Sequence, residues 1–262
     1  MKKAEGLKRR KLTRRQFLGL GLCALPAAAG LDGRFVEPSW PRVTRLDLAP
    51  DSKCRFVQIS DLHYKGDAEY AAEIVQTVNA LEPEFVCFNG DLVEEARFAP
   101  AALGFIRQIR RPVYGCPGNW DYGSGANFKA YDEAFRATGG AWLVDRSVVL
   151  PNHDLEIIGM GLGGVVALGD AKATRRVLLL HYPMQADRLD GRRYDLILAG
   201  HSHGGQVRLP LYGAPVLPYG VGRYDKGLFD SAGGPLYVNV GLGTYMFPVR
   251  FNCRPEITVI RV

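Results

Sequence analysis

Several features are scarce in this chain of 262 residues, and each scarcity excludes a class of protein. No stretch of the sequence reaches the roughly 20 consecutive apolar residues that a membrane-spanning helix needs. The five cysteines include no Cys-x-x-Cys pair, so neither a zinc finger nor a thioredoxin-type site is indicated. Histidine is also rare, with five residues, and this makes the positions of those five informative.

An excess of basic residues is missing from the body of the chain. Lys and Arg outnumber Asp and Glu by 33 to 27, but residues 1–15 carry eight of the basic residues and one acidic residue. The remaining residues therefore hold 25 basic and 26 acidic side chains. Proteins that bind nucleic acid present a basic stripe to the phosphate backbone, so we expect no nucleic-acid partner here.

The first 30 residues have the composition of an export signal. Arg14 and Arg15 precede an uncharged run at residues 17–30, which is only 14 residues long and ends among three alanines. This order forms a signal peptide, and the paired arginines favour the twin-arginine export machinery as a partner. The alternative is a basic helix that lies on an anionic membrane. We expect residues 1–30 to be a twin-arginine signal peptide or an anchor, which places the protein in the periplasm or on the outer face of the cytoplasmic membrane.

Residues 31–52 contain three prolines and read as an extended lead-in, and residues 53–262 read as one domain. In the first half of this domain, short apolar strands alternate with segments of helical periodicity, and the second half is mostly strands. The expected strands are residues 56–60, 84–88, 112–116, 142–150, 155–159, 177–181, 196–199, 206–209, 236–240 and 257–262, and the expected helices are residues 67–81, 100–109, 126–138 and 184–189. This order predicts an α/β fold of two stacked sheets flanked by helices.

Side chains that bind metals follow five of the predicted strands. They occur in the blocks Asp61-Leu62-His63, Asn89-Gly90-Asp91, Gly118-Asn119-Trp120-Asp121, His181 and Gly200-His201-Ser202-His203. Four of the five histidines fall in these blocks, which argues against coincidence. Ligands of an open α/β sheet gather beyond the carboxyl ends of its strands, so we expect these side chains to meet at one place.

The number and type of these ligands predict two metal ions. Four imidazoles and three carboxylate or amide oxygens are too many for one ion, and they suit two borderline divalent ions that share a bridging Asp. Such a pair of ions clamps a phosphoryl group, and a water that bridges them attacks as hydroxide. Mn, Fe and Zn all remain open as the metals.

In this order, the five blocks resemble the signature of the calcineurin-like metallophosphoesterase superfamily: D-x-H, G-D, G-N-H-[DE], H and G-H-x-H. Residues 200–208 and 252–256 further resemble a narrower group, the bacterial twin-arginine-exported phosphodiesterases, which are relatives of one class of UDP-diacylglucosamine pyrophosphatases. The resemblance implies a four-layer α/β/β/α sandwich of two mixed sheets flanked by helices. It also implies the metal ligands, which are Asp61, His63 and His203 for one ion, Asn119, His181 and His201 for the other, and Asp91 for both.

One position departs from the family pattern. Trp120 stands where the family usually has a His that stabilises the transition state or protonates the leaving oxygen, and an indole offers only a neutral N–H. General acid catalysis is typically worth about 10²–10⁴-fold, so its loss is tolerated best with a leaving group of low pKa, such as a phosphate of a pyrophosphate. Trp120 therefore marks such a leaving group, provides an aromatic platform for a sugar or a base, or is only a packing residue.

The loop at residues 210–234 and the segment at residues 245–251 are rich in aromatic and aliphatic residues, and Arg208, Arg223 and Arg250 are near them in sequence. A surface of this kind suits a lipid-bearing phosphate or a membrane surface. The alternative is a small core beneath a loop. Asn252 and Arg254 are further candidates for phosphate contacts, because they lie in a family-like motif.

We interpret the chain as a dinuclear-metal-dependent hydrolase of phosphodiester bonds that uses a metal-bridging hydroxide on an envelope or lipid-linked substrate. The residues expected to act in catalysis are Asp91, Asn119, Trp120 and His201. One alternative is a UDP-2,3-diacylglucosamine pyrophosphatase of lipid A synthesis, a cytoplasmic step that a working export signal disfavours. The other alternative is a metal-stabilised binding module with little turnover, because Trp120 replaces the histidine that the family usually has at this position.

Overall fold

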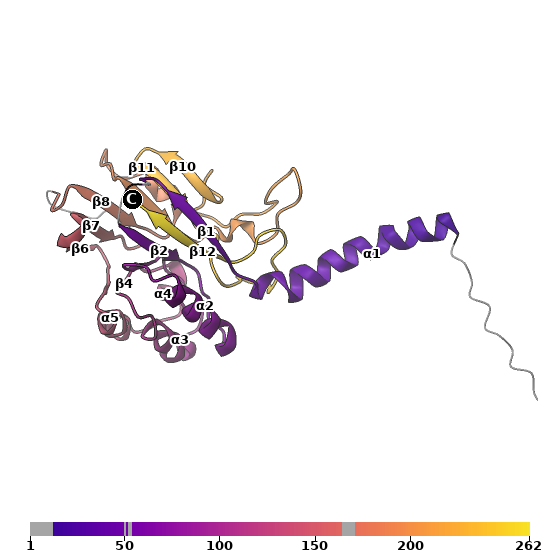
Figure 1. The fold of residues 1–262 in the computed structure, drawn as a ribbon, viewed down its shortest axis with the longest axis horizontal. Coiled ribbons are helices and arrows are strands. Elements are labelled where there is room, and N and C mark those ends of the chain that lie inside the picture. The colour runs from indigo at the N-terminus through magenta and orange to yellow at the C-terminus, as the bar shows by residue number, and fades with distance from the viewer. Residues whose placement is uncertain (1–12, 50, 52–53, 164–170) are drawn as a thin grey trace, which may run out of the picture.

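The computed structural model describes residues 13–49, 51, 54–163 and 171–262, and the basic residues at positions 2–11 of the predicted leader lie outside this part. Within it, two six-stranded sheets stack against each other, and helices cover the outer face of the first sheet (Figure 1). The expected α/β fold of two mixed sheets flanked by helices is therefore confirmed.

The first sheet has the strand order β1-β12-β2-β3-β4-β5. Its strands are β1 (Arg42–Asp47), β12 (Glu256–Arg261), β2 (Arg55–Ile59), β3 (Val86–Phe88), β4 (Val113–Gly115) and β5 (Ala141–Trp142). β12 runs antiparallel to β2, and the other neighbours are parallel. Because β2, β3 and β4 are parallel, the residues that follow them in the chain meet at one edge of the sheet.

The second sheet has the strand order β10-β11-β9-β8-β7-β6. Its strands are β10 (Gly227–Ser231), β11 (Gly234–Val238), β9 (Leu196–Ala199), β8 (Arg175–Leu179), β7 (Leu155–Gly159) and β6 (Arg146–Leu150). The four central strands are parallel, and β10 and β6 pair antiparallel at the two sides. The carboxyl ends of β8 and β9 thus lie next to each other.

Three amphipathic helices, α2 (Ala68–Ala80), α3 (Ala99–Ile106) and α5 (Phe128–Ala137), pack on the first sheet. α2 begins after Asp67, whose carboxylate caps the helix by accepting a hydrogen bond from the backbone N–H of Tyr70 at 3.0 Å. The buried residues of α2 are Ala71, Ile74, Val75 and Val78. They recur at the spacing of one helical face, and burying each large side chain stabilises the fold by about 1.5–3 kcal/mol.

Successive residues of β2 enter two different cores. Val57 faces the helices, and Phe56 faces the second sheet, where its ring stacks on that of Phe85 with centroids 4.7 Å apart. A third core lies on the outer face of the second sheet, beneath the 3-10 helix η4 (Pro183–Asp187) and Tyr224. In the described residues, the fourth layer of the expected sandwich is therefore a 3-10 helix with a loop, and not a long α-helix.

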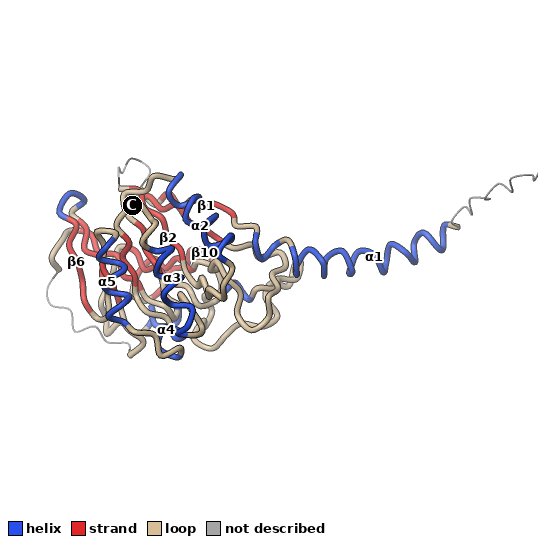
Figure 2. Tube along the Cα trace, turned by 90° about the horizontal axis from the view of Figure 1, so that it is seen from below, coloured by secondary structure: helices blue, strands red, loops and turns tan. Residues whose placement is uncertain are grey.

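The N-terminal helix α1 (Arg14–Phe35) projects away from the two sheets (Figures 1 and 2). None of the helices in the described part of the chain has both the length and the apolar content to cross a membrane. The remaining helical segments are short: α4 (Asn119–Gly123), η1 (Glu37–Ser39), η2 (Ala96–Phe98), η3 (Pro151–His153) and η5 (His203–Gly205).

The structure corrects several expected elements. Residues 142–150 form no single strand, because Asp145 adopts a left-handed turn with φ 53° and the chain passes from β5 in one sheet to β6 in the other. The strand expected at residues 206–209 is also wrong. Gln206 has φ 59°, and only isolated bridges follow it, from Val207 to Phe251 and from Leu209 to Gly213.

The predicted lead-in at residues 31–52 and the predicted loop at residues 210–234 both contain helices or strands. The described part of residues 31–52 includes the end of α1, the 3-10 helix η1 and the edge strand β1. The expected loop at 210–234 includes β10, which pairs with β11 as a hairpin. β1 forms because it pairs with β12, far along the chain, and this pairing overrides the local composition, whereas β10 forms by local pairing with β11.

Candidate metal centre

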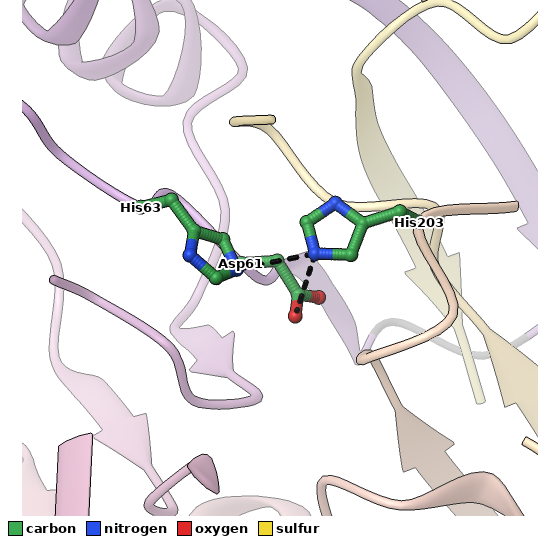
Figure 3. A group of neighbouring side chains, drawn as sticks. All are labelled: Asp61, His63 and His203. Carbon is green, nitrogen blue, oxygen red and sulfur yellow. Dashed lines mark hydrogen bonds and ion pairs between the residues drawn. The ribbon is translucent and has the colours of Figure 1, made fainter. Parts of the chain in front are cut away.

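The sequence-predicted ligands come together at the carboxyl edge of both sheets, in two groups. Asp61, His63 and His203 form one group (Figure 3), and Asp91, His181 and His201 form the other. Within each group, one ligand atom from each residue lies within 4.8 Å of the others, and all six residues are buried. They follow β2, β3, β8 and β9, which are neighbours in their respective sheets.

The backbone at these positions is held in an unusual conformation. Five predicted ligands have a left-handed φ, between 45° and 66°: Asp61, His63, Asp91, His201 and His203. A non-glycine residue in this region costs on the order of 1–3 kcal/mol, and such residues persist where the surrounding structure holds them. The left-handed turn directly after a strand aims the side chain over the sheet edge, toward the partners from the other strands.

The glycines of the motifs are required by close packing around the ligand carboxylates. A Cβ atom on Gly118 would collide with the carboxylate of Asp91, and a Cβ atom on Gly200 would collide with Ser60 and with the carboxylate of Asp61. The backbone N–H of His201, the residue after Gly200, donates to Asp61 Oδ2 at 3.0 Å. Because glycine has no side chain, the backbone after β9 can approach Asp61, and the backbone after β4 can approach Asp91.

The ligand atoms of the first group face one another closely. His63 Nε2 lies 3.1 Å from His203 Nε2, and His203 Nε2 lies 3.7 Å from Asp61 Oδ1. Asp91 Oδ2 approaches the same place, 3.5 Å from His63 Nε2. Two nitrogens and two carboxylate oxygens therefore surround one point.

The second group repeats this arrangement and shares one atom with the first. His181 Nε2 lies 3.1 Å from His201 Nδ1, 3.0 Å from Asn119 Oδ1 and 3.2 Å from Asp91 Oδ2. The same oxygen of Asp91 thus belongs to both groups. Asp91 therefore lies within reach of both groups, and its role as a bridge between two ions stays a prediction.

These spacings fit bound cations. Ligands about 2.1 Å from an ion lie about 3.0–3.4 Å from each other in tetrahedral or octahedral coordination, and most of the separations here are of that size. Two imidazole nitrogens at 3.1 Å with converging lone pairs repel each other unless a proton or a cation lies between them. The mixture of imidazole, carboxylate and amide donors fits Mn, Fe or Zn.

The outer nitrogens of three histidines lie beside groups that can only accept a hydrogen bond. His63 Nδ1 lies 2.9 Å from the Glu94 carboxylate, His181 Nδ1 lies 2.7 Å from the Asn89 carbonyl, and His201 Nε2 lies 2.6 Å from the Tyr219 carbonyl. Each outer nitrogen must therefore carry the proton, which leaves the inner nitrogen free as a ligand. Partners of this kind orient metal-binding histidines and raise their basicity.

The buried carboxylate of Asp121 holds the loop that carries Asp91. It accepts hydrogen bonds from the backbone N–H groups of Asp91 and Gly118 at 2.8 Å, from that of Leu92 at 3.0 Å and from the hydroxyl of Tyr131 at 3.0 Å. Burial, followed by the charge of Asp91, raises the pKa of Asp121 to about 6.

Without ions, the second group holds a proton. Burial lowers the pKa of His181, but the carboxylate of Asp91 outweighs burial and brings this pKa to about 9. Burial raises the pKa of Asp91, and the charges of His181 and His63 outweigh it and bring this pKa down to about 2. Burial, with the charge of His181, lowers the pKa of His201 to about 3. The protonated His181 and the ionised Asp91 form an ion pair. A metal ion that binds here would take the place of the proton on His181.

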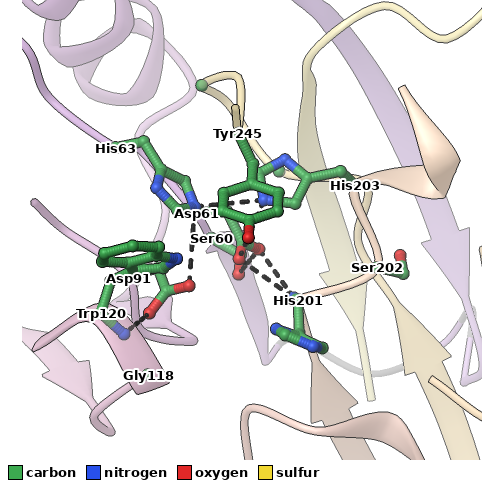
Figure 4. A network of polar contacts seen from close by, with 12 residues as sticks. Ser60, Asp61, His63, Asp91, Gly118, Trp120, His201, Ser202, His203 and Tyr245 are labelled. Atoms are coloured by element: carbon green, nitrogen blue, oxygen red, sulfur yellow. Dashed lines mark hydrogen bonds and ion pairs between the residues drawn. The ribbon is translucent and has the colours of Figure 1, made fainter. Parts of the chain in front are cut away.

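A cavity of about 210 Å³ opens above both groups. Its lining includes Trp120, Tyr182, Tyr219 and Tyr245 in addition to the ligands. The backbone N–H of Trp120 donates to Asp91 Oδ1 at 2.7 Å, and the indole lies at the side of the cavity, beside Tyr245 (Figure 4). The predicted metal ligands and Trp120 thus lie in or directly beneath this cavity.

Several residues that contact the metal ligands were not predicted from the sequence. Glu94 lies three residues after Asp91, and Asp121 stands inside a recognised block, but nothing in the sequence signals what either side chain contacts. Tyr219 and Tyr245 were expected only as members of an aromatic rim. Their place at the metal groups depends on how the second sheet folds back over the first.

The expected arginines do not line the cavity. Arg250 is fully buried and donates to four backbone carbonyls, those of Val240, Gly241, Gly243 and Cys253. Arg208 pairs with Asp225 at 2.8 Å. The guanidinium of Arg223 contacts Tyr224 and the carbonyl of Asp230.

Asn252 and Arg254, the two further candidates for phosphate contacts, also point elsewhere. Arg254 stacks over the ring of Trp40, with its guanidinium carbon 3.6 Å from the centroid, and the backbone of Asn252 donates to Glu37. Both residues tie the C-terminal segment to the chain around η1.

A family model for calcineurin-like phosphoesterases matches residues 54–205, and the chain belongs to this family. The uncharacterized metallophosphoesterase YkuE of Bacillus subtilis is 30% identical over 95% of this chain and 97% of its own length. The phosphodiesterase YaeI of Escherichia coli is 27% identical over 96% of this chain and 99% of its own length. The UDP-2,3-diacylglucosamine pyrophosphatase LpxG of Chlamydia muridarum is 23% identical over 92% of this chain and 94% of its own length.

The family and the site together define a metallophosphoesterase that hydrolyses phosphoric diesters and uses two divalent ions. When bound, such a pair of ions lowers the pKa of a water and offsets the charge of the phosphoryl oxygens. The chain's own contribution is to fix the ligand atoms on strained strand ends, to exclude bulk water by burial, and to surround the substrate with aromatic side chains.

Proposed function

We propose that this metallophosphoesterase hydrolyses a phosphodiester or pyrophosphate bond in a lipid-linked substrate at a membrane surface of the cell envelope. In this proposal, one ion is held by Asp61, His63 and His203, the other by Asn119, His181 and His201, and both by Asp91. Asp91, Asn119 and His201 position the reacting phosphoryl group through the ions, and Trp120 contacts the part of the substrate that leaves. The observation that carries the proposal is an exposed apolar face that reaches the cavity at Tyr219.

This apolar face consists of residues 31–40, 209–219 and 246–247. In the described residues, eleven of the fifteen exposed large hydrophobic side chains belong to it: Leu31, Phe35, Val36, Trp40, Leu209, Leu211, Tyr212, Val216, Tyr219, Met246 and Phe247. Scattered exposed apolar residues are normal in soluble proteins, whereas a contiguous group marks an interaction surface. The concentration of these side chains in three segments therefore indicates an interaction surface.

The three segments are joined to each other at the base of α1. The backbone N–H of Arg250 donates to the carbonyl of Gly33 at 2.8 Å, and that of Arg208 donates to the carbonyl of Phe251 at 2.9 Å. Figures 1 and 2 show α1 and the loops of the C-terminal half on the same side of the body. A surface that met this face would also meet α1.

The apolar face continues into the metal cavity. Tyr219 lines the cavity and is 86% exposed, and its carbonyl accepts the hydrogen bond from His201. Tyr245, another residue of the cavity wall, directly precedes Met246 and Phe247. A phosphate at the headgroup level of a bilayer would therefore lie next to the ions while its apolar chains remained in the lipid.

The sequence of the leader supports the place of action. The paired Arg14 and Arg15 and the basic residues around them suit twin-arginine export, and uncleaved they would attract an anionic membrane surface. We infer an envelope location on the outer side of the cytoplasmic membrane. Replacing both arginines by lysine and fractionating cells tests it, because the variant protein should accumulate in the cytoplasm. An unchanged distribution would overturn the export proposal.

A second candidate is hydrolysis of the pyrophosphate of UDP-2,3-diacylglucosamine. The similarity to LpxG favours it, as does Trp120, since a pyrophosphate has a good leaving group that needs little proton donation. This candidate also has a lipid-linked substrate, so the apolar face fits it equally. The alternative of a binding module without turnover has no support in the site, where all seven predicted ligands are gathered.

The experiment compares substrates in vesicles with a soluble diester. The full-length protein is loaded with Mn²⁺ and assayed on bis(p-nitrophenyl) phosphate, on anionic vesicles that contain a phospholipid diester, and on UDP-2,3-diacylglucosamine. The variant Leu211→Ser with Phe247→Ser should lower vesicle binding and the rate on lipid relative to the rate on the soluble diester. Leu228→Ser changes an exposed leucine outside the apolar face and is the matched control. Equal rates on lipid for the two variants would overturn the proposal.

A further inference from the structure

Tyr245 holds a hydroxyl group above the ligands, on the opposite side of the cavity from the strand ends. Its ring packs against His63, His203 and Trp120, with centroid distances of 6.2, 6.3 and 5.8 Å. In the view of Figure 4 the phenol of Tyr245 points toward the carboxylate of Asp61, and the indole of Trp120 and the carboxylate of Asp91 lie to one side of it. The ring therefore lies against both histidines of the first metal group, and its hydroxyl belongs to the lining of the cavity above them.

Gln206 holds the backbone of Tyr245 from both sides. Its Oε1 accepts a hydrogen bond from the backbone N–H of Tyr245 at 2.5 Å, and its Nε2 donates to the carbonyl of Tyr245 at 3.0 Å. Gln206 itself follows His203 in the chain and has a strained φ of 59°. One side chain thus fixes the position of Tyr245 relative to a predicted metal ligand.

The hydrogen-bond donors that the cavity lining offers besides the metal ligands are neutral: the indole N–H of Trp120 and the hydroxyls of Tyr182, Tyr219 and Tyr245. Its described lining is made of the ligands His63, Asp91, Asn119, His201 and His203 with Trp120, Tyr182, Pro218, Tyr219 and Tyr245, and it includes neither lysine nor arginine. The family's usual histidine is replaced by Trp120. A phosphoryl oxygen that points away from the ions therefore depends on one of these neutral donors, because a buried anionic oxygen without a donor is costly.

We propose that the Tyr245 hydroxyl donates a hydrogen bond to a non-bridging oxygen of the bound phosphodiester and so takes over the charge-stabilising role of the missing histidine. Gln206 is a positioning residue that keeps this hydroxyl at the ions. The inference rests on the phosphodiester hydrolysis of the family and is independent of whether the substrate is lipid-linked. A phenol is a neutral donor near neutral pH, so the interaction adds no charge to the site.

The test uses the full-length protein loaded with Mn²⁺ and the soluble substrate bis(p-nitrophenyl) phosphate. Tyr245→Phe removes one oxygen and keeps the ring, and we expect kcat to fall by about 10–10²-fold, near the lower range for removing an oxyanion donor. Equilibrium binding of inorganic phosphate, measured by calorimetry, should weaken about tenfold. The metal content should stay at that of the unchanged protein. Tyr122→Phe, on the surface end of α4 outside the cavity lining, is the matched control.

Gln206 is tested in a double-mutant cycle. Gln206→Ala should lower phosphate affinity in the same direction as Tyr245→Phe, and it should add little further loss in the Tyr245→Phe background, because its effect passes through the hydroxyl. Unchanged phosphate affinity and kcat in Tyr245→Phe would overturn the role of the hydroxyl. A full, additive loss from Gln206→Ala in the double variant would overturn its positioning role. Neither result depends on lipid, so a failure here is separate from a failure of the proposed substrate.

Discussion

The carboxylate of Asp121 accepts a hydrogen bond from the backbone N–H of Asp91 at 2.8 Å, and this contact connects two buried acids with different tasks. The side chain of Asp91 points at both metal groups. The side chain of Asp121 accepts hydrogen bonds from the backbone of the loop that carries Asp91. Like charges this close raise each other's pKa, and the donors around Asp121 reduce that cost. The residue that we propose as the bridge between the two ions thus depends on a neighbour that belongs to neither metal group.

Asp121→Asn should disrupt this loop without removing any ligand. An amide presents an NH₂ group where the carboxylate accepted from backbone N–H groups, so buried donors lose their partners at about 1–3 kcal/mol each. We expect a lower free energy of unfolding in urea and a loss of one or both ions by metal analysis. Asp190→Asn, in an exposed turn, is the control and should change neither. Wild-type metal content in Asp121→Asn would show that the loop holds Asp91 without this carboxylate.

The metal-free protein should become less stable as the pH rises. The pKa of His181 is about 9 in the folded chain against an ordinary value of 6.5, so the stability from its protonated form is fully present below pH 6.5 and is lost as the pH rises through 9. Burial also raises the pKa of Asp61, which acts in the same direction. Urea unfolding in the presence of a chelator at the two pH values measures the change. A stability that increases over this range would contradict the assignment.

Metal affinity should have the opposite pH dependence. An ion at the second group must displace the proton of His181, so its affinity should increase with pH up to about 9, close to tenfold per pH unit for one proton. Calorimetry in two buffers with different enthalpies of ionisation counts the protons released on binding near pH 7. Release of no proton at that pH would mean that His181 is already neutral in the folded chain.

Glu94→Gln should weaken the first ion more than the second. The carboxylate of Glu94 binds the outer nitrogen of His63, and loss of such a partner typically costs about 10–100-fold in metal affinity. His181 and His201 have backbone carbonyls as partners and should keep their ion. In a titration followed by metal analysis, one of the two sites should therefore lose affinity while the other keeps it. Glu95→Gln, at the adjacent exposed position, is the control and should leave both affinities unchanged.

Two glycine substitutions should have opposite effects. Alanine at Gly200 places a Cβ against Ser60 and Asp61, which forces apart the strand end that carries His201, and we expect loss of metal binding and of activity. Alanine at Gly104, in α3, meets no atom within 4 Å and should stabilise the protein by about 0.5–1 kcal/mol. Thermal unfolding and metal content of both variants check the prediction. Full metal occupancy in Gly200→Ala would refute the close-packing explanation.

The metal groups could be predicted from the sequence because each ligand directly follows an apolar strand, and parallel strands end at one edge. Asp61, Asp91 and His181 needed only that rule and the spacing of their blocks. The contacts of Glu94 and Tyr245 could not be predicted in this way, because they depend on how loops curl over the edge. Tyr245 follows the last block by 42 positions and reaches the site only through the stacking of the second sheet on the first.

The errors in the fold have a common physical cause. Residues 142–150 are predicted as one strand although Asp145, Arg146 and Ser147 interrupt its apolar residues, and periodicity alone does not reveal that Asp145 turns left-handed and sends the chain to another sheet. Arg250 is charged and was expected at the surface, but its five N–H donors match a cluster of backbone carbonyls. In both cases, distant partners determine the structure, and local sequence carries no record of them.

The most direct test of the central claim is anomalous diffraction from crystals of the full-length protein soaked with Mn²⁺. We expect two anomalous peaks on either side of Asp91 Oδ2, one among Asp61, His63 and His203 and the other among Asn119, His181 and His201. A single peak, or a peak that Asp91 does not contact, would contradict a dinuclear centre bridged by this residue.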